Sequence, residues 1–246
     1  MPPKIILIRH GEAEHNATRN WSIPDPPLTS LGEEQCKELH KHLQSNFPLA
    51  NEIDTIITSP FTRTVQTTLI GLDYLIKKGI RIEPDALWQE NSDKPCDTGS
   101  SLKDISSRYP QIDFKGVDPT YPSKTGVYAF TRTAVVARGQ TVLRDLYNRP
   151  EKVIAVVSHS GFLRAAVSRR HYFNADFRVF TFEKGQEGGD LRLIESDLTQ
   201  GKGGMGWSDE GVAEIGEDEF PPEKEAEVVK EQQGERVGTE VTKEVP

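Results

Sequence analysis

KIILIRHGE, residues 4–12, joins a continuous apolar run to a polar end, and this stretch decides the fold. A short run rich in isoleucine, without alternating polar residues, is typical of a strand buried on both faces of a sheet. The run stops at an arginine, a histidine and a glycine, of which His10 is the middle residue. VIAVVSHSG, residues 153–161, has the same pattern, an apolar run followed by polar residues that include His159. We therefore expect two buried strands that each end at a histidine.

Further strand-like and helical patterns alternate along the rest of the chain. Runs typical of strands occupy residues 53–57 and 80–82, and helical spacing covers residues 31–47, 62–76, 101–109, 126–148 and 162–171. Residues 177–182 and 191–194 read as a last strand pair joined by a glycine-rich turn at 185–189. This order predicts the α/β class, with a mostly parallel sheet and helices on both faces in three layers. Ligands of such sheets bind beyond the carboxyl ends of the strands, where both histidines are expected.

The charge of the chain is concentrated at one end. Its 246 residues fit one domain of roughly 200 residues with an appendage. From residue 208 onward there are 13 acidic and 4 basic residues, a net charge of −9, whereas the preceding residues carry +1 of the total of −8. Beyond residue 200 the composition offers too little apolar area to offset the entropy of ordering. We expect a domain over residues 1–200 and an acidic, disordered tail over residues 201–246.

Several classes of protein are disfavoured by the sequence. No apolar run reaches the roughly 18 to 20 residues of a membrane helix, and the run before Arg9 is too short for a secretory signal. The two cysteines make no disulfide framework and no Cys-x-x-Cys pair, and no basic stripe offers a surface for nucleic acid. We expect a cytoplasmic protein, with a nuclear location left open, that binds neither membrane nor nucleic acid.

The polar ends of the predicted strands carry the residues suited to chemistry. His10 could act as a nucleophile, a metal ligand or a phosphate contact, and Arg9 precedes it. Arg63 opens the helix after the second strand, and a cation at a helix start is poorly matched to the helix dipole, so it needs a compensating anion. With His159 at the same edge, the pocket is dense in donors and suits a phosphoryl group. Glu90, after the third strand, is the best-placed acid to protonate a leaving oxygen.

A metal site is the rival interpretation of the first histidine. His10, Glu12, Glu14 and His15 lie close together in the sequence, but they do not have the His-Glu-x-x-His arrangement of a helix-borne zinc site. The neighbouring arginines would also repel a cation. We therefore expect neither a metal nor an organic cofactor.

Four motifs occur in order along the chain. They are Arg9-His10-Gly11-Glu12, Leu28-Thr29-x-x-Gly32-x-x-Gln35, Ser59-Pro60-x-x-Arg63-x-x-Gln66-Thr67 and Val156-Val157-Ser158-His159. Together they resemble the histidine phosphatase superfamily, in its phosphoglycerate mutase-like branch and among its small fungal-type members. The resemblance extends from the first strand through about residue 171 and implies the phosphoglycerate mutase-like fold.

The resemblance also implies roles for individual residues. His10 would become a phosphohistidine, with Arg9, Arg63 and His159 binding the phosphoryl group. Asn16 would contact the same group. Glu90 would act first as an acid and then as a base, with Asp93 and Glu12 as the alternatives for this role.

Two departures from the family pattern concern substrate binding. Ser160 follows the second histidine where the family usually has glycine, which brings a hydroxyl near the phosphate. Residues 93–100 replace the segment that usually shapes the substrate pocket of the mutases, and their Lys94 could bind a second anionic group together with Ser100 and Ser101. The candidate substrate-binding residues are therefore Asn16, Ser22, Lys94 and Ser160.

Three functions are compatible with these patterns. The leading one is a metal-independent phosphatase that hydrolyses a small phosphorylated metabolite through a phosphohistidine on His10. The second is phosphoryl transfer of the phosphoglycerate mutase type. The third is a phosphatase-like module that binds a protein partner through its acidic tail.

Overall fold

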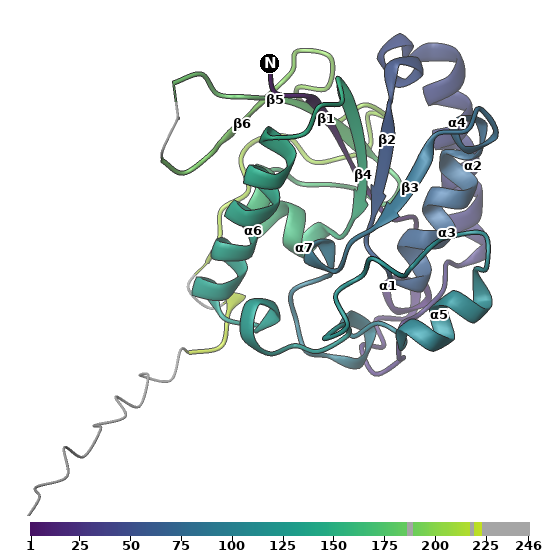
Figure 1. The fold of residues 1–246 in the computed structure, drawn as a ribbon, viewed down its shortest axis with the longest axis vertical. Coiled ribbons are helices and arrows are strands. Elements are labelled where there is room, and N and C mark those ends of the chain that lie inside the picture. Colours follow the sequence, from purple (N-terminus) through teal and green to yellow (C-terminus); the bar gives the residue numbers. More distant parts are fainter. Residues whose placement is uncertain (186–188, 217–218, 223–246) are drawn as a thin grey trace, which may run out of the picture.

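A six-stranded sheet, in the order β3-β2-β4-β1-β5-β6, runs through the middle of the molecule (Figure 1). This computed structural model describes residues 1–185, 189–216 and 219–222. Its strands are β1 Lys4–Arg9, β2 Thr55–Thr58, β3 Arg81–Pro84, β4 Val153–Ser158, β5 Phe177–Phe182 and β6 Leu193–Glu195.

The strand pairing confirms the predicted mostly parallel sheet. Strands β3, β2, β4 and β1 are parallel neighbours, whereas β5 runs antiparallel to β1 and β6 antiparallel to β5. The predicted turn between β5 and β6 falls partly outside the described residues. Arg9 pairs with Ser158 in the register of β1 and β4. The next residue of each strand, His10 and His159, therefore lies at the same sheet edge, as predicted.

Helices cover both faces of the sheet and complete the three layers. Helices α2, α3 and α4 lie on one side and α6, α7 and the π-helical turn η5 on the other (Figure 1). Side chains of β1 alternate between the two cores, because Ile6 and Ile8 pack on the α2 side and Ile5 and Leu7 on the α6 side. The helices are α1 Glu14–Thr18, α2 Ser30–Asn46, α3 Thr62–Gly71, α4 Asp73–Lys77, α5 Leu102–Arg108, α6 Arg132–Tyr147, α7 Ser160–Phe162 and η5 Leu163–Ser168.

Three predicted helices differ from the sequence pattern, and the one expected over residues 162–171 is formed by α7 and the π-helical turn η5, which ends at Ser168. The helix expected over residues 62–76 is divided at Leu72 into α3 and α4. The helix expected over 126–148 starts only at Arg132, because the side chain of Thr131 caps it by accepting a hydrogen bond from the N–H of Ala134 at 3.2 Å. The residues before Thr131 form the 3₁₀ turn η4, Gly126–Tyr128.

The packed body continues past residue 200, where the sequence placed the domain boundary. The carboxylate of Asp176 accepts backbone hydrogen bonds from Met205 at 2.8 Å and Ser208 at 3.0 Å, and Ala213 is fully buried. Gly203 has a φ of 81°, and a Cβ there would approach the Asp176 carboxylate to 2.5 Å. The boundary at residue 200 was predicted from the low apolar content of the following residues. These residues are held in place instead by their backbone N–H groups, which donate to the buried Asp176 carboxylate. Residues 223–246 lie outside the described residues, so disorder there remains a prediction.

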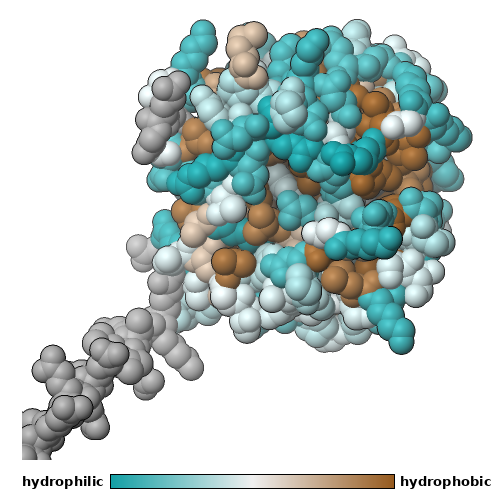
Figure 2. All heavy atoms as spheres, in the orientation of Figure 1, coloured by the Kyte–Doolittle hydropathy of each residue, from teal (hydrophilic) through white to brown (hydrophobic). Residues whose placement is uncertain are grey.

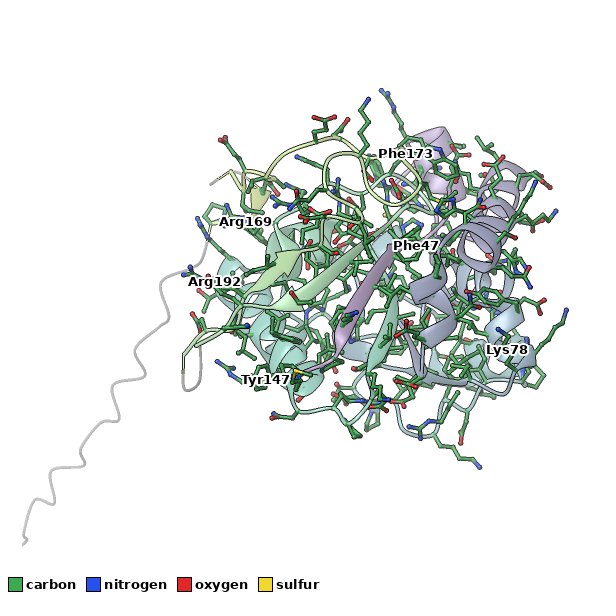
Figure 3. All side chains as sticks on the ribbon, turned by 90° about the horizontal axis from the view of Figure 1, so that it is seen from above. Phe47, Lys78, Tyr147, Arg169, Phe173 and Arg192 are labelled. Carbon is green, nitrogen blue, oxygen red and sulfur yellow. The ribbon has the colours of Figure 1, made fainter. Side chains whose placement is uncertain are left out.

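The outer surface mixes polar and apolar side chains. Figure 2 shows hydrophilic residues over most of one face, with separate hydrophobic patches between them. Seen from above, Lys78 and Arg192 lie at opposite sides of the molecule, with Phe47 between them (Figure 3). Phe47 packs its ring against Phe177 at a centroid distance of 4.9 Å. None of the helices in the described part of the chain is long and apolar enough to cross a membrane.

Candidate active site

The ring of His10, directly after β1, is held in one protonation state. Its Nδ1 donates to the carbonyl oxygen of Gly11 at 2.7 Å, and the Nε–H of Arg63 donates to its Nε2 at 3.2 Å. Because a guanidinium can only donate, Nε2 must present its lone pair. Burial lowers the pKa of His10 well below its ordinary value, and the charges of Arg63 and Arg9 lower it further. His10 is therefore a neutral imidazole with an unprotonated Nε2 in the pocket.

The backbone around His10 is fixed on several sides. Its N–H donates to the carbonyl oxygen of Ser158 at 3.1 Å, and its own carbonyl oxygen accepts from the side chain of Asn174 at 3.2 Å. A Cβ on Gly11 would lie 2.7 Å from the carbonyl oxygen of Gly32 in α2. Glycine is needed after the histidine because helix α2 approaches the backbone at this point.

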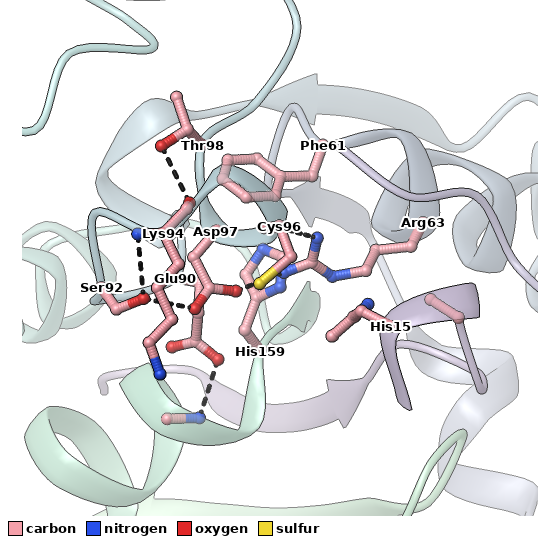
Figure 4. A network of polar contacts seen from close by, with 12 residues as sticks. His15, Phe61, Arg63, Glu90, Ser92, Lys94, Cys96, Asp97, Thr98 and His159 are labelled. Carbon is pink, nitrogen blue, oxygen red and sulfur yellow. Dashed lines mark hydrogen bonds and ion pairs between the residues drawn. The ribbon is translucent and has the colours of Figure 1, made fainter. Parts of the chain in front are cut away.

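Arg63, in the first turn of α3, is fully buried and bonded on three sides. Besides His10, its Nη1 donates to the carbonyl oxygen of Cys96 at 2.6 Å and its Nη2 to Oδ1 of Asp97 at 3.2 Å. Oδ2 of Asp97 accepts from the hydroxyl of Ser92 at 2.6 Å. Figure 4 shows this chain of contacts leading from Ser92 to the guanidinium. Asp97 thus supplies the anion that a cation at a helix start requires.

His159 faces His10 across the pocket. The two ring centroids are 5.3 Å apart, and Nε2 of His159 lies 2.9 Å from the hydroxyl of Ser59. The ring of Phe61 packs edge-on against His159 at 4.7 Å. His159 is fully buried, which lowers its pKa well below the ordinary value, with Arg63 as the next cause. Both histidines are therefore neutral at pH 7 in this structure.

Arg9 supplies a second guanidinium at the same edge. It donates from Nη1 to the carbonyl oxygen of Tyr172 at 2.8 Å. Burial lowers its pKa to about 10, while the nearby Glu90 acts in the opposite direction. Arg9 therefore remains charged at neutral pH.

The carboxylate of Glu90 lies against the first residues of α7. Its Oε2 accepts from the N–H of Gly161 at 3.0 Å, and its Oε1 accepts from the N–H groups of Phe162 at 2.8 Å and Asn91 at 2.9 Å. Burial raises the pKa of Glu90, and the charge of Asp97 raises it further, although the backbone N–H groups oppose this. A Cβ on Gly161 would come within 2.5 Å of Oε1, so the glycine makes room for this acid.

The two alternative acids lie elsewhere. Glu12 accepts a hydrogen bond from the hydroxyl of Thr29 at 2.8 Å, at the start of α2. Asp93 is exposed. Of the three acids, the half-buried Glu90 is the one whose charge interacts with Arg9, Arg63 and Asp97.

Asn16 and Ser160 lie next to the cluster of candidate catalytic residues, which are Arg9, His10, Arg63, Glu90 and His159 and are called the catalytic cluster below. Oδ1 of Asn16 accepts from the N–H of Ala13 at 3.1 Å, and its Nδ2 donates to Nε2 of His15 at 3.1 Å. The ring of His15 is 6.0 Å from that of His10, so His15 lies near the first histidine. Ser160 is the first residue of α7, immediately after His159.

Ser22 and Lys94 are the other two predicted substrate-binding residues. Both are exposed. The N–H of Ser22 donates to the side chain of Asn20 at 3.0 Å, and Nζ of Lys94 lies 5.7 Å from the ring centroid of Trp21. Ser100, the expected partner of Lys94, instead donates its hydroxyl to the buried Asp25 at 2.6 Å. Ser22 and Ser100 thus form hydrogen bonds with Asn20 and Asp25, and their roles in substrate binding stay predictions.

Three residues of the site were not assigned a role from the sequence. Ser59 belongs to the motif that starts at Ser59-Pro60, but no role was predicted for it. Asp97 could have been predicted, because Arg63 at the start of a helix requires a nearby anion. Lys124 gave no signal, because it follows Glu90 by 34 positions in an irregular segment. Its Nζ donates to the carbonyl oxygen of Glu90 at 2.6 Å.

Comparison with known proteins assigns the chain to a family. The model of the histidine phosphatase superfamily, branch 1, matches residues 5–183. The chain belongs to the histidine phosphatase superfamily. This confirms the resemblance inferred from the four motifs, and it makes the protein an enzyme of the histidine phosphatase type.

Individual known proteins resemble the chain to different degrees. A Schizosaccharomyces pombe protein named "Probable phosphatase" is 30% identical over 165 residues, which cover 65% of this chain and 75% of that protein. An Arabidopsis thaliana "phosphoglycerate mutase-like protein" is 29% identical over 203 residues, covering 67% and 73% of the two chains. A mycobacterial glucosyl-3-phosphoglycerate phosphatase has the same fold, with a TM-score of 0.50, 18% identity and coverage of 79% of this chain and 98% of that one.

Proposed function

We propose that the protein hydrolyses the phosphate monoester of a small metabolite, without a metal, through a phosphohistidine on His10. The observation that carries the proposal is the hydrogen bond from Arg63 to Nε2 of His10, at 3.2 Å. It fixes the imidazole proton on Nδ1 and leaves the lone pair on Nε2, and the incoming phosphoryl group takes the place of this lone pair as the acceptor for Arg63. A neutral, oriented imidazole is the form that can attack phosphorus.

The first step forms the phosphoenzyme. Nε2 of His10 attacks phosphorus in line with the ester oxygen, the bond between phosphorus and that oxygen breaks, and Glu90 gives its proton to the departing oxygen. Arg9, Arg63 and His159 surround the position of the remaining oxygens, where negative charge gathers in the transition state. The raised pKa of Glu90 favours the protonated form that this step requires.

The second step returns the enzyme to its starting state. Glu90, now a carboxylate, accepts a proton from water as the water oxygen attacks phosphorus. The bond between phosphorus and Nε2 breaks, its electron pair stays on Nε2 of His10, and inorganic phosphate leaves. The arginines supply the positive charge for both steps, so the proposal needs no metal.

Phosphoryl transfer of the mutase type is the second candidate, because the Arabidopsis relatives carry mutase-like names. The two candidates share the first step and differ in what removes the phosphoryl group from His10. Release of one inorganic phosphate per substrate consumed supports hydrolysis. Recovery of an isomeric phosphate ester instead would favour the mutase.

The proposal is tested by replacing His10 and measuring hydrolysis of p-nitrophenyl phosphate. His10→Ala should lower kcat by several orders of magnitude, because the nucleophile acts as a unit with its neighbours. His40→Ala is the matched control, since His40 lies on α2 and contacts the carbonyl oxygen of Ile70. A kcat of His10→Ala equal to that of the wild type would contradict the proposal.

A further inference from the structure

We propose that Lys124, supported by Arg138, forms a second anion subsite that binds a carboxylate or phosphate carried by the leaving group. The inference rests on the proposed phosphatase function and narrows its substrates to esters with a second anionic group. It moves this role away from Lys94, which the sequence suggested.

Lys124 lies beside Glu90 and Phe61. Its Nζ donates to the backbone carbonyl oxygen of Glu90 at 2.6 Å and lies 5.6 Å from the ring centroid of Phe61. Phe61 in turn packs against His159, so the ammonium contacts the backbone of the acid and a ring that touches the second histidine (Figure 4 shows Phe61, Glu90 and His159). The leaving oxygen must lie close to Glu90 to receive its proton. Lys124 is therefore on the leaving-group side of the phosphoryl site.

Arg138 of α6 places a second cation behind Glu90. It is only 2% exposed, its Nη2 donates to Oδ1 of Asn91 at 2.9 Å, and its guanidinium stacks on Phe162 at 4.2 Å. Asn91 and Phe162 are two of the residues whose N–H groups hold the Glu90 carboxylate. Arg138 thus contacts two residues that hold the Glu90 carboxylate, and it adds positive charge on the side of Glu90 where the leaving group would depart.

The charges around Lys124 favour an incoming anion. In the described part of the chain, neither Lys124 nor Arg138 forms an ion pair with a carboxylate. Arg138, Arg63, Asp97, Glu90 and the neutral His159 surround the amine, and burial, followed by Arg138, lowers the pKa of Lys124 to about 7. Lys124 is half-buried and Arg138 is buried, and burial of a cation without a paired anion is costly, so an anion bound beside the two would offset this cost. Once a phosphoryl dianion occupies Arg9 and Arg63, Lys124 and Arg138 remain to bind a second anion.

Three matched esters test the subsite in the full chain. They are phenyl phosphate, 4-carboxyphenyl phosphate and 1,4-phenylene bisphosphate, which differ in whether the leaving group carries no charge, a carboxylate or a phosphate. The quantity measured is the ratio of kcat/KM for each anionic ester to kcat/KM for phenyl phosphate. We expect the wild type to prefer at least one anionic ester, and the ester preferred identifies the anion.

Lys124→Gln should lower that ratio by about 10- to 100-fold, the range expected for loss of a hydrogen bond to a charged group. Lys124→Arg should retain much of the preference because the charge is kept. Lys103→Gln, which removes an exposed lysine of α5, is the control and should leave the ratio unchanged.

Three results would overturn the subsite. They are an equal loss by Lys124→Gln on all three esters, no change in the ratio, and a selective loss in Lys94→Gln that is absent from Lys124→Gln. Failure of the phosphatase proposal has a different signature, since the wild type would then hydrolyse none of the three esters or His10→Ala would hydrolyse them at the wild-type rate.

Discussion

Asp97 joins two parts of the active site through one carboxylate. It pairs with Arg63 at 3.2 Å, and its charge is among the causes that raise the pKa of Glu90. A negative charge beside an acid disfavours ionisation of that acid, so Asp97 favours the protonated form of Glu90 that the proposed first step requires. One side chain therefore contacts the guanidinium proposed to bind phosphate and raises the pKa of the proposed proton donor.

Removal of this charge should shift the pH dependence of activity. Phosphorylation needs protonated Glu90, so kcat/KM falls as the pH rises through the pKa of Glu90. Asp97→Asn removes a cause that raises this pKa, and the falling limb of the profile should move to lower pH. Asp93→Asn, in the same loop but exposed, is the control. A limb that stays in place or moves to higher pH in Asp97→Asn would contradict this assignment.

Glu90 itself should matter most when the leaving group is a poor one. Glu90→Gln should reduce kcat for an alkyl phosphate by roughly 10² to 10⁴-fold, the range typical of a lost general acid. The reduction for p-nitrophenyl phosphate should be smaller, because nitrophenolate leaves without a proton. Glu12→Gln is the matched control, since its carboxylate is bonded to Thr29. Equal losses on both substrates would argue against proton donation by Glu90.

At the scale of elements, Asp25 connects the segment before α2 to the start of α3 and to the 95–101 segment. Its carboxylate accepts from the N–H of Thr62 at 3.0 Å, from the hydroxyl of Thr62 at 2.6 Å and from the hydroxyl of Ser100 at 2.6 Å. Thr62 precedes Arg63, and the 95–101 segment contains Asp97. Asp25 thus acts as a cap for α3 supplied from a distant part of the sequence and holds together the elements on either side of Arg63.

Loss of this cap should destabilise the whole domain. Asp25→Ala leaves several buried donors without an acceptor and should lower the free energy of unfolding in urea by about 3 kcal/mol. Asp73→Ala removes only an exposed pair with Lys77 within α4, and the expected loss is below about 0.5 kcal/mol. Similar unfolding midpoints for Asp25→Ala and the wild type would show that Asp25 does not have this role.

At the scale of the molecule, the residues after 200 belong to the packed body. Asp176 is fully buried and holds this segment through its backbone, while Phe220 packs into the α6-side core. A chain ending at residue 222 keeps these contacts and should unfold at the temperature of the full chain. A chain ending at residue 200 leaves the Asp176 carboxylate without these donors and should unfold at a clearly lower temperature in a thermal scan. Equal melting temperatures of the two truncated chains would refute this.

The sequence predicted the sheet and the catalytic cluster because both depend on short, local patterns. An apolar run followed by a histidine identifies the end of a buried strand, and parallel pairing then brings His10 and His159 together. Lys124 and Asp25 could not be predicted in the same way. Their contacts join irregular segments distant in sequence, and no periodicity indicates where such segments fold back.

The most direct test of the account is to trap the phosphoenzyme. Glu90→Gln should slow the attack of water on the phosphohistidine, so acid-free quenching during turnover of a ³²P-labelled ester should capture labelled protein. A phosphohistidine mechanism predicts a label that is stable to alkali, labile to acid and located by peptide mapping on His10. An acid-stable label, a label on another residue, or turnover by the wild type without a labelled intermediate in either protein would contradict it.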